Sequence, residues 1–225
     1  DMVLKSKADF GVAFDGDFDR AVFFDDEGHH IEGEYMVGLL SSIFLNNGEN
    51  NKIVHDPRVI WNTRDIVLEN KGIPIQALTG HAYIKKAMRQ NNAVYGGEIS
   101  AHHYFKDFAY CDSGIIPWLL MIEYLSSSSK ALSELMKERR EKFPSSGELN
   151  FTVNDPSETF SDVMKKFSDK ALVKDFSDGI SFTFKNWRFN LRSSKTEAII
   201  RLNVESRLDK NHLGKKISEI SEIIL

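Results

Sequence analysis

The segment from Gly33 to about Lys142 alternates short strand-like runs with helical runs of roughly ten residues, and this pattern narrows the possible folds most. It is typical of βαβ units, which build a mainly parallel sheet covered by helices. The run from Ser113 to Leu125 is apolar almost all round, which predicts a helix buried on several sides. We expect strands at residues 52–56, 74–78 and 93–95, and helices at residues 35–45, 61–70, 81–90 and 113–125.

The regions on either side of this segment follow other patterns. Residues 1–32 read as a strand hairpin with an acidic bend and a short return strand, whose open sheet edge could pair with a second copy of the chain. After Pro144 the pattern predicts a strand, a helix, two strands around Trp187, a long strand and a final helix. The predicted class is α/β: a mixed βαβ sheet domain with helices on both faces (33–143), followed by a small α+β C-terminal domain (144–225).

The overall composition removes several classes of function. A formal net charge of −4 gives no general attraction to nucleic acid or to an anionic membrane. The sequence has no apolar run of the roughly 20 residues that a membrane-spanning helix needs. Cys111 is the single cysteine, so an internal disulfide is impossible and a reducing, cytoplasmic location is expected.

The acidic bend carries Asp15, Asp17 and Asp19, whose carboxylates can converge on a hard cation such as Mg²⁺ or Ca²⁺. An EF-hand would need glycine where Arg20 stands, and helices where the flanks are β-branched and aromatic. A glycosyltransferase Asp-x-Asp site or a merely solvated turn could also have these residues. Three acids between apolar strands would repel one another without a cation. The adjoining Arg20 indicates an anion as well, and metal beside arginine suggests phosphoryl chemistry.

A second loop follows the strand that ends in Gly96-Gly97. The paired glycines would let the backbone turn sharply, and Glu98 and Ser100 could then point together toward vicinal hydroxyls. His102 is an open candidate, whereas His103 reads as structural.

A third loop, Arg192-Ser193-Ser194-Lys195-Thr196-Glu197, joins two predicted strands. Its guanidinium, hydroxyls and successive amides suit a phosphate, although a polar hairpin turn would have the same composition.

Together the three loops resemble those of the α-D-phosphohexomutase superfamily, and the resemblance covers essentially all of the chain. The acidic bend is similar to that family's Asp-Gly-Asp-x-Asp-Arg metal loop, the second loop to its sugar-binding loop, and the third to its Arg-x-Ser-x-Thr-Glu-Pro phosphate loop. The stretch from Tyr95 through Leu120 looks most like the bacterial phosphomannomutases that feed GDP-mannose synthesis.

The resemblance implies a four-domain protein, of which residues 1–32 would be the tail of the second domain, and it implies a reaction. A magnesium-held phosphoserine would exchange phosphate with a hexose phosphate, turning mannose 6-phosphate into mannose 1-phosphate through a bisphosphate. The implied roles are Asp15, Asp17 and Asp19 for Mg²⁺; Arg20 and His81 for catalysis; Glu98, Ser100, His102 and Arg58 for the sugar; and Arg192, Ser194, Lys195 and Thr196 for phosphate.

The chain departs from the family pattern in two ways. Lys195 stands where relatives carry Asn or Gly, and Ala198 where they carry Pro, so the phosphate loop differs in shape. No Ser-His-Asn-Pro-like segment is present, so we expect the phosphoserine and an N-terminal half to be supplied elsewhere and the chain to be inactive alone. Two further functions stay open, a phosphoglucomutase and a non-catalytic sugar-phosphate-binding fragment.

Overall fold

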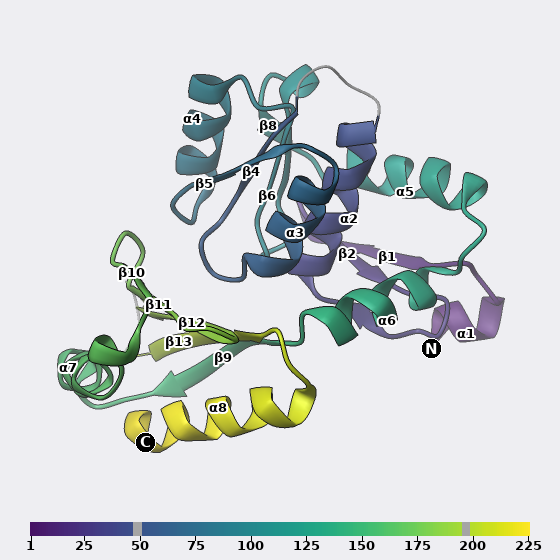
Figure 1. The fold of residues 1–225 in the computed structure, drawn as a ribbon. Coiled ribbons are helices and arrows are strands. Elements are labelled where there is room, and N and C mark those ends of the chain that lie inside the picture. Colours follow the sequence, from purple (N-terminus) through teal and green to yellow (C-terminus); the bar gives the residue numbers. More distant parts are fainter. Residues whose placement is uncertain (47–50, 195–198) are drawn as a thin grey trace. The chain divides into compact units, whose positions relative to one another are not determined.

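The computed structural model describes residues 1–46, 51–194 and 199–225 (Figure 1). The chain forms two compact units. Unit 1 comprises residues 1–56 and 60–139, and unit 2 comprises residues 57–59 and 140–225. The three residues from Pro57 to Val59 therefore belong to unit 2, although their neighbours on both sides belong to unit 1.

Unit 1 contains a five-stranded sheet in the order β5-β4-β6-β7-β8. Strand β4 pairs in parallel with β5 and β6, whereas β6, β7 and β8 follow one another antiparallel. The strands are β4 (Lys52–His55), β5 (Ile73–Gln76), β6 (Tyr95–Gly97), β7 (His103–Phe105) and β8 (Cys111–Asp112); the helices between them are α3 (Trp61–Glu69) and α4 (His81–Asn91), with a 3₁₀ turn at Lys106–Phe108.

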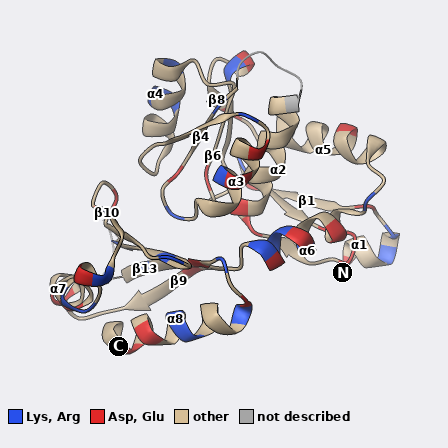
Figure 2. Cartoon of the chain, in the orientation of Figure 1, with Lys and Arg blue, Asp and Glu red and all other residues tan. Residues whose placement is uncertain are grey.

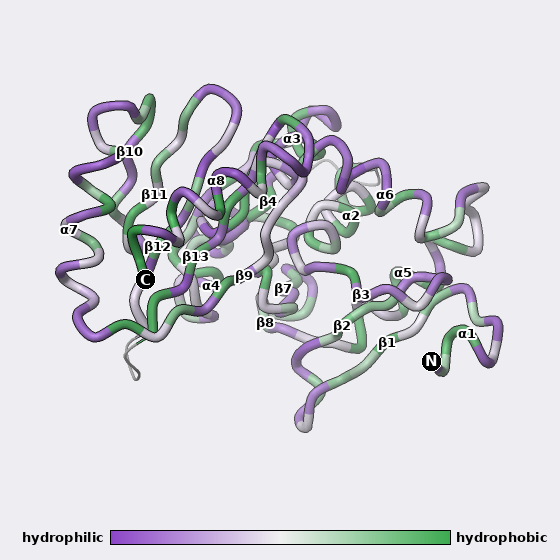
Figure 3. The backbone as a smooth tube through the Cα atoms, turned by 90° about the horizontal axis from the view of Figure 1, so that it is seen from below, coloured by the Kyte–Doolittle hydropathy of each residue, from purple (hydrophilic) through white to green (hydrophobic). Residues whose placement is uncertain are grey.

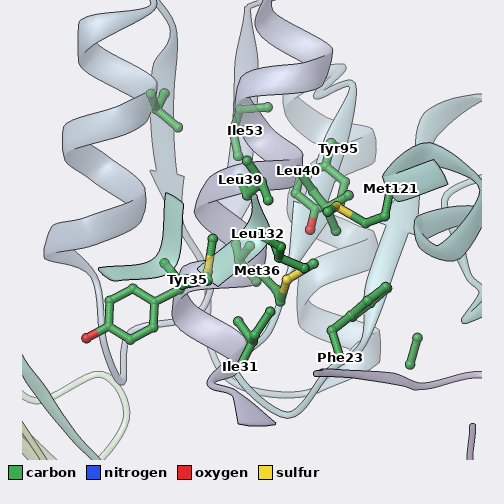
Figure 4. Close-up of a cluster of buried hydrophobic side chains, with 14 of the residues drawn as sticks. Phe23, Ile31, Tyr35, Met36, Leu39, Leu40, Ile53, Tyr95, Met121 and Leu132 are labelled. Carbon is green, nitrogen blue, oxygen red and sulfur yellow. The ribbon is translucent and has the colours of Figure 1, made fainter. Parts of the chain in front are cut away.

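Alternation along the strands gives this sheet two apolar faces. The neighbours Ile53, Tyr95 and Phe105 pack with α2 (Gly33–Asn46) in one hydrophobic cluster, part of which Figure 4 shows. Val54 and Tyr104 lie in a second cluster with Ile84 and Met88 of α4. Helices therefore cover both faces, which confirms the predicted α/β class.

The glycine pair in β6 has a different role from the predicted one. Gly96 and Gly97 lie within the strand and make no sharp turn. A Cβ atom on Gly96 would lie 2.7 Å from the sulfur of Met88, and one on Gly97 would lie 2.7 Å from Val37. The pair thus lets α4 and α2 approach the sheet closely from opposite sides.

The first 32 residues form helix α1 (Met2–Ser6) and a separate antiparallel sheet in the order β1-β2-β3. The three strands of this sheet are β1 (Gly11–Phe14), β2 (Ala21–Phe24) and β3 (His30–Ile31).

Helix α5 (Ile115–Ser127) buries only Pro117 and Met121 among its residues, while Leu119 is 53% exposed. The prediction that this helix is buried on several sides is therefore wrong: it packs along one side only.

Unit 2 is an antiparallel sheet in the order β10-β11-β12-β13-β9. Its apolar face, which includes Phe189 and Leu202, packs with buried residues of two helices, Val163 on α7 and Leu213 on α8. Helix α7 begins where Asp155 accepts hydrogen bonds from two first-turn amides, and hydrophobic and hydrophilic residues alternate along it (Figure 3). The elements are β9 (Ser145–Thr152), α7 (Pro156–Phe167), a 3₁₀ turn (Ser168–Lys170), β10 (Val173–Asp175), β11 (Ile180–Thr183), β12 (Trp187–Ser193), β13 (Ile199–Ser206) and α8 (Lys210–Ile224).

Helix α6 (Leu132–Lys142) was not predicted from the sequence. Acidic and basic residues are interspersed along it (Figure 2), and only Leu132 and Met136 are buried. None of the helices in the described parts of the chain is long and apolar enough to cross a bilayer.

Candidate functional site

The acidic bend lies between β1 and β2 and brings its three aspartates together. Their oxygen atoms lie within 4.8 Å of one another. Arg20 closes the bend, because its Nε donates to Oδ2 of Asp15 at 2.6 Å and its amide donates to Oδ1 of the same residue. Of the three aspartates, Asp17 is the exposed one, so its carboxylate is accessible to a ligand.

The electrostatics of the bend suit a cation. Partial burial and the nearby Asp15 and Asp17 raise the pKa of Asp19, against the opposing effect of His102. Burial alone would raise the pKa of Asp15, but the hydrogen bonds from Arg20 outweigh it and lower this pKa. Mg²⁺ takes oxygen ligands about 2.1 Å away, so its ligand atoms lie about 3–4 Å apart. The three carboxylates therefore fit Mg²⁺ with little closing of the loop.

His102 joins the second loop to the acidic bend through a β-bridge with Arg20. Its Nδ1 lies 3.1 Å from Oδ2 of Asp112 and 3.9 Å from Oδ2 of Asp19. Lys85 of α4 pairs with the other oxygen of Asp112 at 2.8 Å. The same ring nitrogen, Nδ1, therefore lies next to both Asp112 and the candidate metal ligand Asp19.

Glu98 and Ser100 do not point the same way, contrary to the prediction. Residues 98–102 form a tight turn, in which the Glu98 amide donates to the carbonyl of His102. Glu98 is buried and accepts hydrogen bonds from the Gly80 amide and the Tyr104 hydroxyl, both at 2.7 Å, whereas Ser100 is exposed. The alternation of an extended strand fails in a turn, so spacing alone misplaced these two side chains.

His81 is exposed at the first turn of α4, next to the Gly80 amide that holds Glu98. The other predicted catalytic residue, Arg20, lies in the acidic bend itself. Of the two histidines proposed for the site, it is His102 that the structure places beside the acidic bend.

The predicted phosphate loop follows β12 in unit 2. The Ser194 amide donates to the carbonyl of Ile199, so the strands on either side of the loop are paired. Arg192 forms an ion pair with Glu148 at 3.0 Å, and Arg58 of the same unit lies 3.7 Å from that carboxylate. Lys195, Thr196 and the departure at Ala198 lie outside the described residues.

The comparisons with known proteins bear on the family and the fold. Residues 32–143 match the family model described as phosphoglucomutase/phosphomannomutase, alpha/beta/alpha domain III. A phosphomannomutase of Escherichia coli K12 is 55% identical over 92% of this chain and 45% of its own length. A protein named phosphohexose mutases from Xanthomonas campestris strain B100 is 52% identical over 99% of this chain and 50% of its own length.

Solved structures have the same fold. The crystal structure of a phosphoglucomutase/phosphomannomutase family protein from Burkholderia thailandensis has a TM-score of 0.82 at 24% identity, covering 99% of this chain and 47% of the other. The chain belongs to the α-D-phosphohexomutase superfamily. It spans about half the length of the curated relatives it matches.

Several residues around the candidate site of this phosphohexomutase chain were not predicted from the sequence. Asp112 contacts His102, Tyr104 contacts Glu98 and Lys85 pairs with Asp112, yet each is a lone polar residue on a different element. The order of strands β6, β7 and β8 and the packing of α4 bring them together, and no local pattern in the sequence signals either.

Gly33 packs closely against the turn at residues 98–102. A Cβ atom at this position would lie 2.1 Å from the carbonyl oxygen of Ile99. We therefore expect Gly33→Ala to shift the 98–102 turn and lower the free energy of unfolding by about 2 kcal/mol. Urea unfolding measures this loss, with Gly16→Ala as the control because a Cβ on Gly16 meets nothing within 4 Å. Equal stability of the two variants would contradict the prediction.

His103 makes stability depend on pH. Complete burial, with a smaller contribution from His102, lowers its pKa from 6.5 to about 3. Between these two values the unfolded chain binds a proton that the folded chain excludes, so stability falls as the pH drops. We expect this histidine to cost about 1.4 kcal/mol for each pH unit within that window.

Urea unfolding at several pH values tests this effect by comparing the chain with a His103→Gln variant, which can still hydrogen-bond to Tyr95. The difference in stability between the two proteins should shrink or reverse as the pH falls from 6.5 toward 3. A difference that stays constant with pH would mean that His103 is not the titrating group.

Proposed function

We propose that this chain provides the metal-, sugar- and phosphate-binding parts of a phosphomannomutase, which converts mannose 6-phosphate into mannose 1-phosphate through a bisphosphate. The name of the 55% identical relative supports this substrate. The observation that carries the proposal is the convergence of Asp15, Asp17 and Asp19 beside His102 within unit 1. The same proposal places the protein in the cytoplasm, ahead of GDP-mannose synthesis.

In this proposal the three aspartates hold Mg²⁺. The ion, when bound, neutralises the charge of the phosphoryl group under transfer. One related mutase, the N-acetylphosphoglucosamine mutase of Aspergillus fumigatus, has been solved in complex with GlcNAc-6P and magnesium. Its TM-score to this chain is 0.69 at 13% identity, covering 95% of this chain and 48% of the other, so this likeness supports the fold alone.

The protein side chains have separate tasks. Arg20 holds Asp15 and offers its remaining guanidinium nitrogens to the phosphoryl oxygens. His102, held by Asp112, accepts the proton of the reacting hydroxyl, a task for which its geometry is better than that of His81. Glu98 shapes the sugar loop from inside, and Ser100 is the exposed group at its tip. Arg192 and Ser194, with Lys195 and Thr196, take the phosphate that is not reacting.

The phosphoryl donor is a serine that this chain does not provide. No Ser-His-Asn-Pro-like segment occurs in the sequence, and the matched relatives are about twice as long. We therefore infer that the donor belongs to an N-terminal half of the parent protein and that the chain alone binds hexose phosphate without converting it.

A second candidate is a mutase that also accepts glucose phosphate. The broader name of the Xanthomonas relative favours it. Mannose and glucose phosphates share the 3- and 4-hydroxyl geometry that the sugar loop would contact, so one site could accept both.

A coupled mutase assay tests the proposal. The protein that contains both this chain and the phosphoserine half should convert mannose 6-phosphate in the presence of Mg²⁺ and lose activity with EDTA. The chain alone should show no turnover but should bind mannose 6-phosphate in calorimetry. Turnover by the chain alone would refute the missing donor, and a full-length protein inactive on both mannose and glucose phosphates would refute the function.

A further inference from the structure

Unit 2 has a polar sheet face opposite the one that α7 and α8 cover. Alternate residues of β12 point to it, and each pairs with a polar residue of β13. Although this face is polar, Asn190 and Asn203 are fully buried, and Arg188 is 2% exposed. The paired positions are Arg188 with Glu205, Asn190 with Asn203, and Arg192 with Arg201.

Arg188 fixes the backbone that carries Arg58. Its guanidinium forms an ion pair with Glu205 and donates to the carbonyls of Arg58 at 2.8 Å and of Pro57 at 3.0 Å. Because the pair is almost completely buried, these bonds are costly to break. Arg58 is thereby held at the polar face of the unit 2 sheet.

Three guanidinium groups meet at one carboxylate, that of Glu148 on β9. Arg192 lies 3.0 Å and Arg58 3.7 Å from its Oε2, while Arg201 lies 3.5 Å from its Oε1. Asp178 adds a weaker contact, 4.0 Å from Arg192. We call Arg58, Arg192 and Arg201 the arginine cluster.

The cluster and its two acids are all charged side chains. Three guanidinium groups, which stay charged at all working pH values, face the two carboxylates of Glu148 and Asp178. Within the described residues, the Nε atoms of Arg192 and Arg201 are buried and make no hydrogen bond. A guanidinium group that already pairs with a carboxylate also suits a phosphate, which can offer it several oxygen atoms.

We propose that Glu148 is a resident counter-anion of the arginine cluster, which an incoming phosphate group displaces from Arg192, so that Glu148 sets the affinity for phosphate. The proposal rests on the proposed function, because it takes Arg192 as a phosphate ligand. Glu148 acts here as a positioning residue that does not touch the sugar. It keeps the cluster ordered without phosphate and weakens phosphate binding by competing for the same guanidinium.

Isothermal titration calorimetry of the chain with inorganic phosphate and with mannose 6-phosphate tests this. Glu148→Gln removes the competing charge and keeps the size of the side chain. It should bind both ligands about tenfold more tightly, as expected for one charge removed a few ångströms from a dianion. A residue with a merely structural role would give the opposite sign, because its loss would disorder the arginines and weaken binding.

Glu222→Gln is the matched control, since it makes the same charge change at an exposed position of α8. Its affinity should stay within about twofold of that of the unaltered chain, as expected for a screened surface charge. Asp178→Asn removes the weaker competing carboxylate and should tighten phosphate binding by a smaller factor. This second variant tests the inference if Glu148→Gln fails to fold. Unchanged or weaker binding by the folded variants would overturn the inference.

The same titrations separate this inference from the proposed function. If the unaltered chain binds neither ligand, both are wrong. If it binds both ligands but Glu148→Gln binds no more tightly, only the role of Glu148 is wrong.

Discussion

Asp17→Asn should lower the kcat of the parent mutase by at least about a thousandfold, because the loss of metal stabilisation is worth several kcal/mol in a phosphoryl-transfer transition state. Asparagine has the shape of aspartate but lacks the charge that holds a hard cation. Asp17 is the exposed member of the acidic bend, and Arg20 forms its ion pairs with Asp15 and Asp19. The substitution should therefore remove the metal without disturbing the loop.

Two measurements show whether the loss comes from the metal. Mg²⁺ titration should show much weaker binding by Asp17→Asn, while thermal unfolding without Mg²⁺ should show equal or slightly higher stability because one repulsive charge is gone. Glu123→Gln, which alters an exposed acid on α5, should leave kcat and Mg²⁺ binding unchanged. A wild-type rate for Asp17→Asn would show that the metal is bound elsewhere.

Arg188→Met should have the largest effect on stability, lowering the free energy of unfolding of unit 2 by about 3–5 kcal/mol. The substitution leaves the carboxylate of Glu205, which is 1% exposed, without this cation in an interior where a lone charge is poorly solvated. The substitution also removes the two hydrogen bonds that Arg188 donates to the carbonyls of Pro57 and Arg58.

The double variant Arg188→Met/Glu205→Leu should recover part of this loss, because removing both charges leaves no buried carboxylate without its partner. Urea unfolding measures both variants, and Lys174→Met, at an exposed position of β10, is the control. If the double variant were less stable than Arg188→Met alone, the buried charge would not be the cause.

The fold was predictable where the apolar pattern is long and regular. Strand β4 and helices α3 and α4 lie within one or two residues of their predicted bounds, because strand-like and helical runs alternate clearly in this part of the sequence. Helix α6 was missed because it buries only Leu132 and Met136, which is too short a stripe to stand out among charged residues.

The candidate site was predictable only where its ligands are adjacent in sequence. The acidic bend places its carboxylates close together within five residues, so local spacing was enough. The surroundings of His102 were not predictable, because Asp112 contacts it from β8 and is itself paired with Lys85 from α4. The direction of Glu98 depends on hydrogen bonds to Gly80 and Tyr104, which no local pattern encodes.

The placement of Pro57–Val59 in unit 2 has a consequence for how this family can be divided. The family model for domain III spans residues 32–143 and so includes these three residues, whereas their partner Arg188 lies beyond it. A gene fragment encoding residues 140–225 would lack the two carbonyls that Arg188 uses. The continuous segment after residue 139 is therefore not the whole of the compact unit. A transplanted C-terminal domain would need a grafted tripeptide, or a second substitution at Arg188, to be stable by itself.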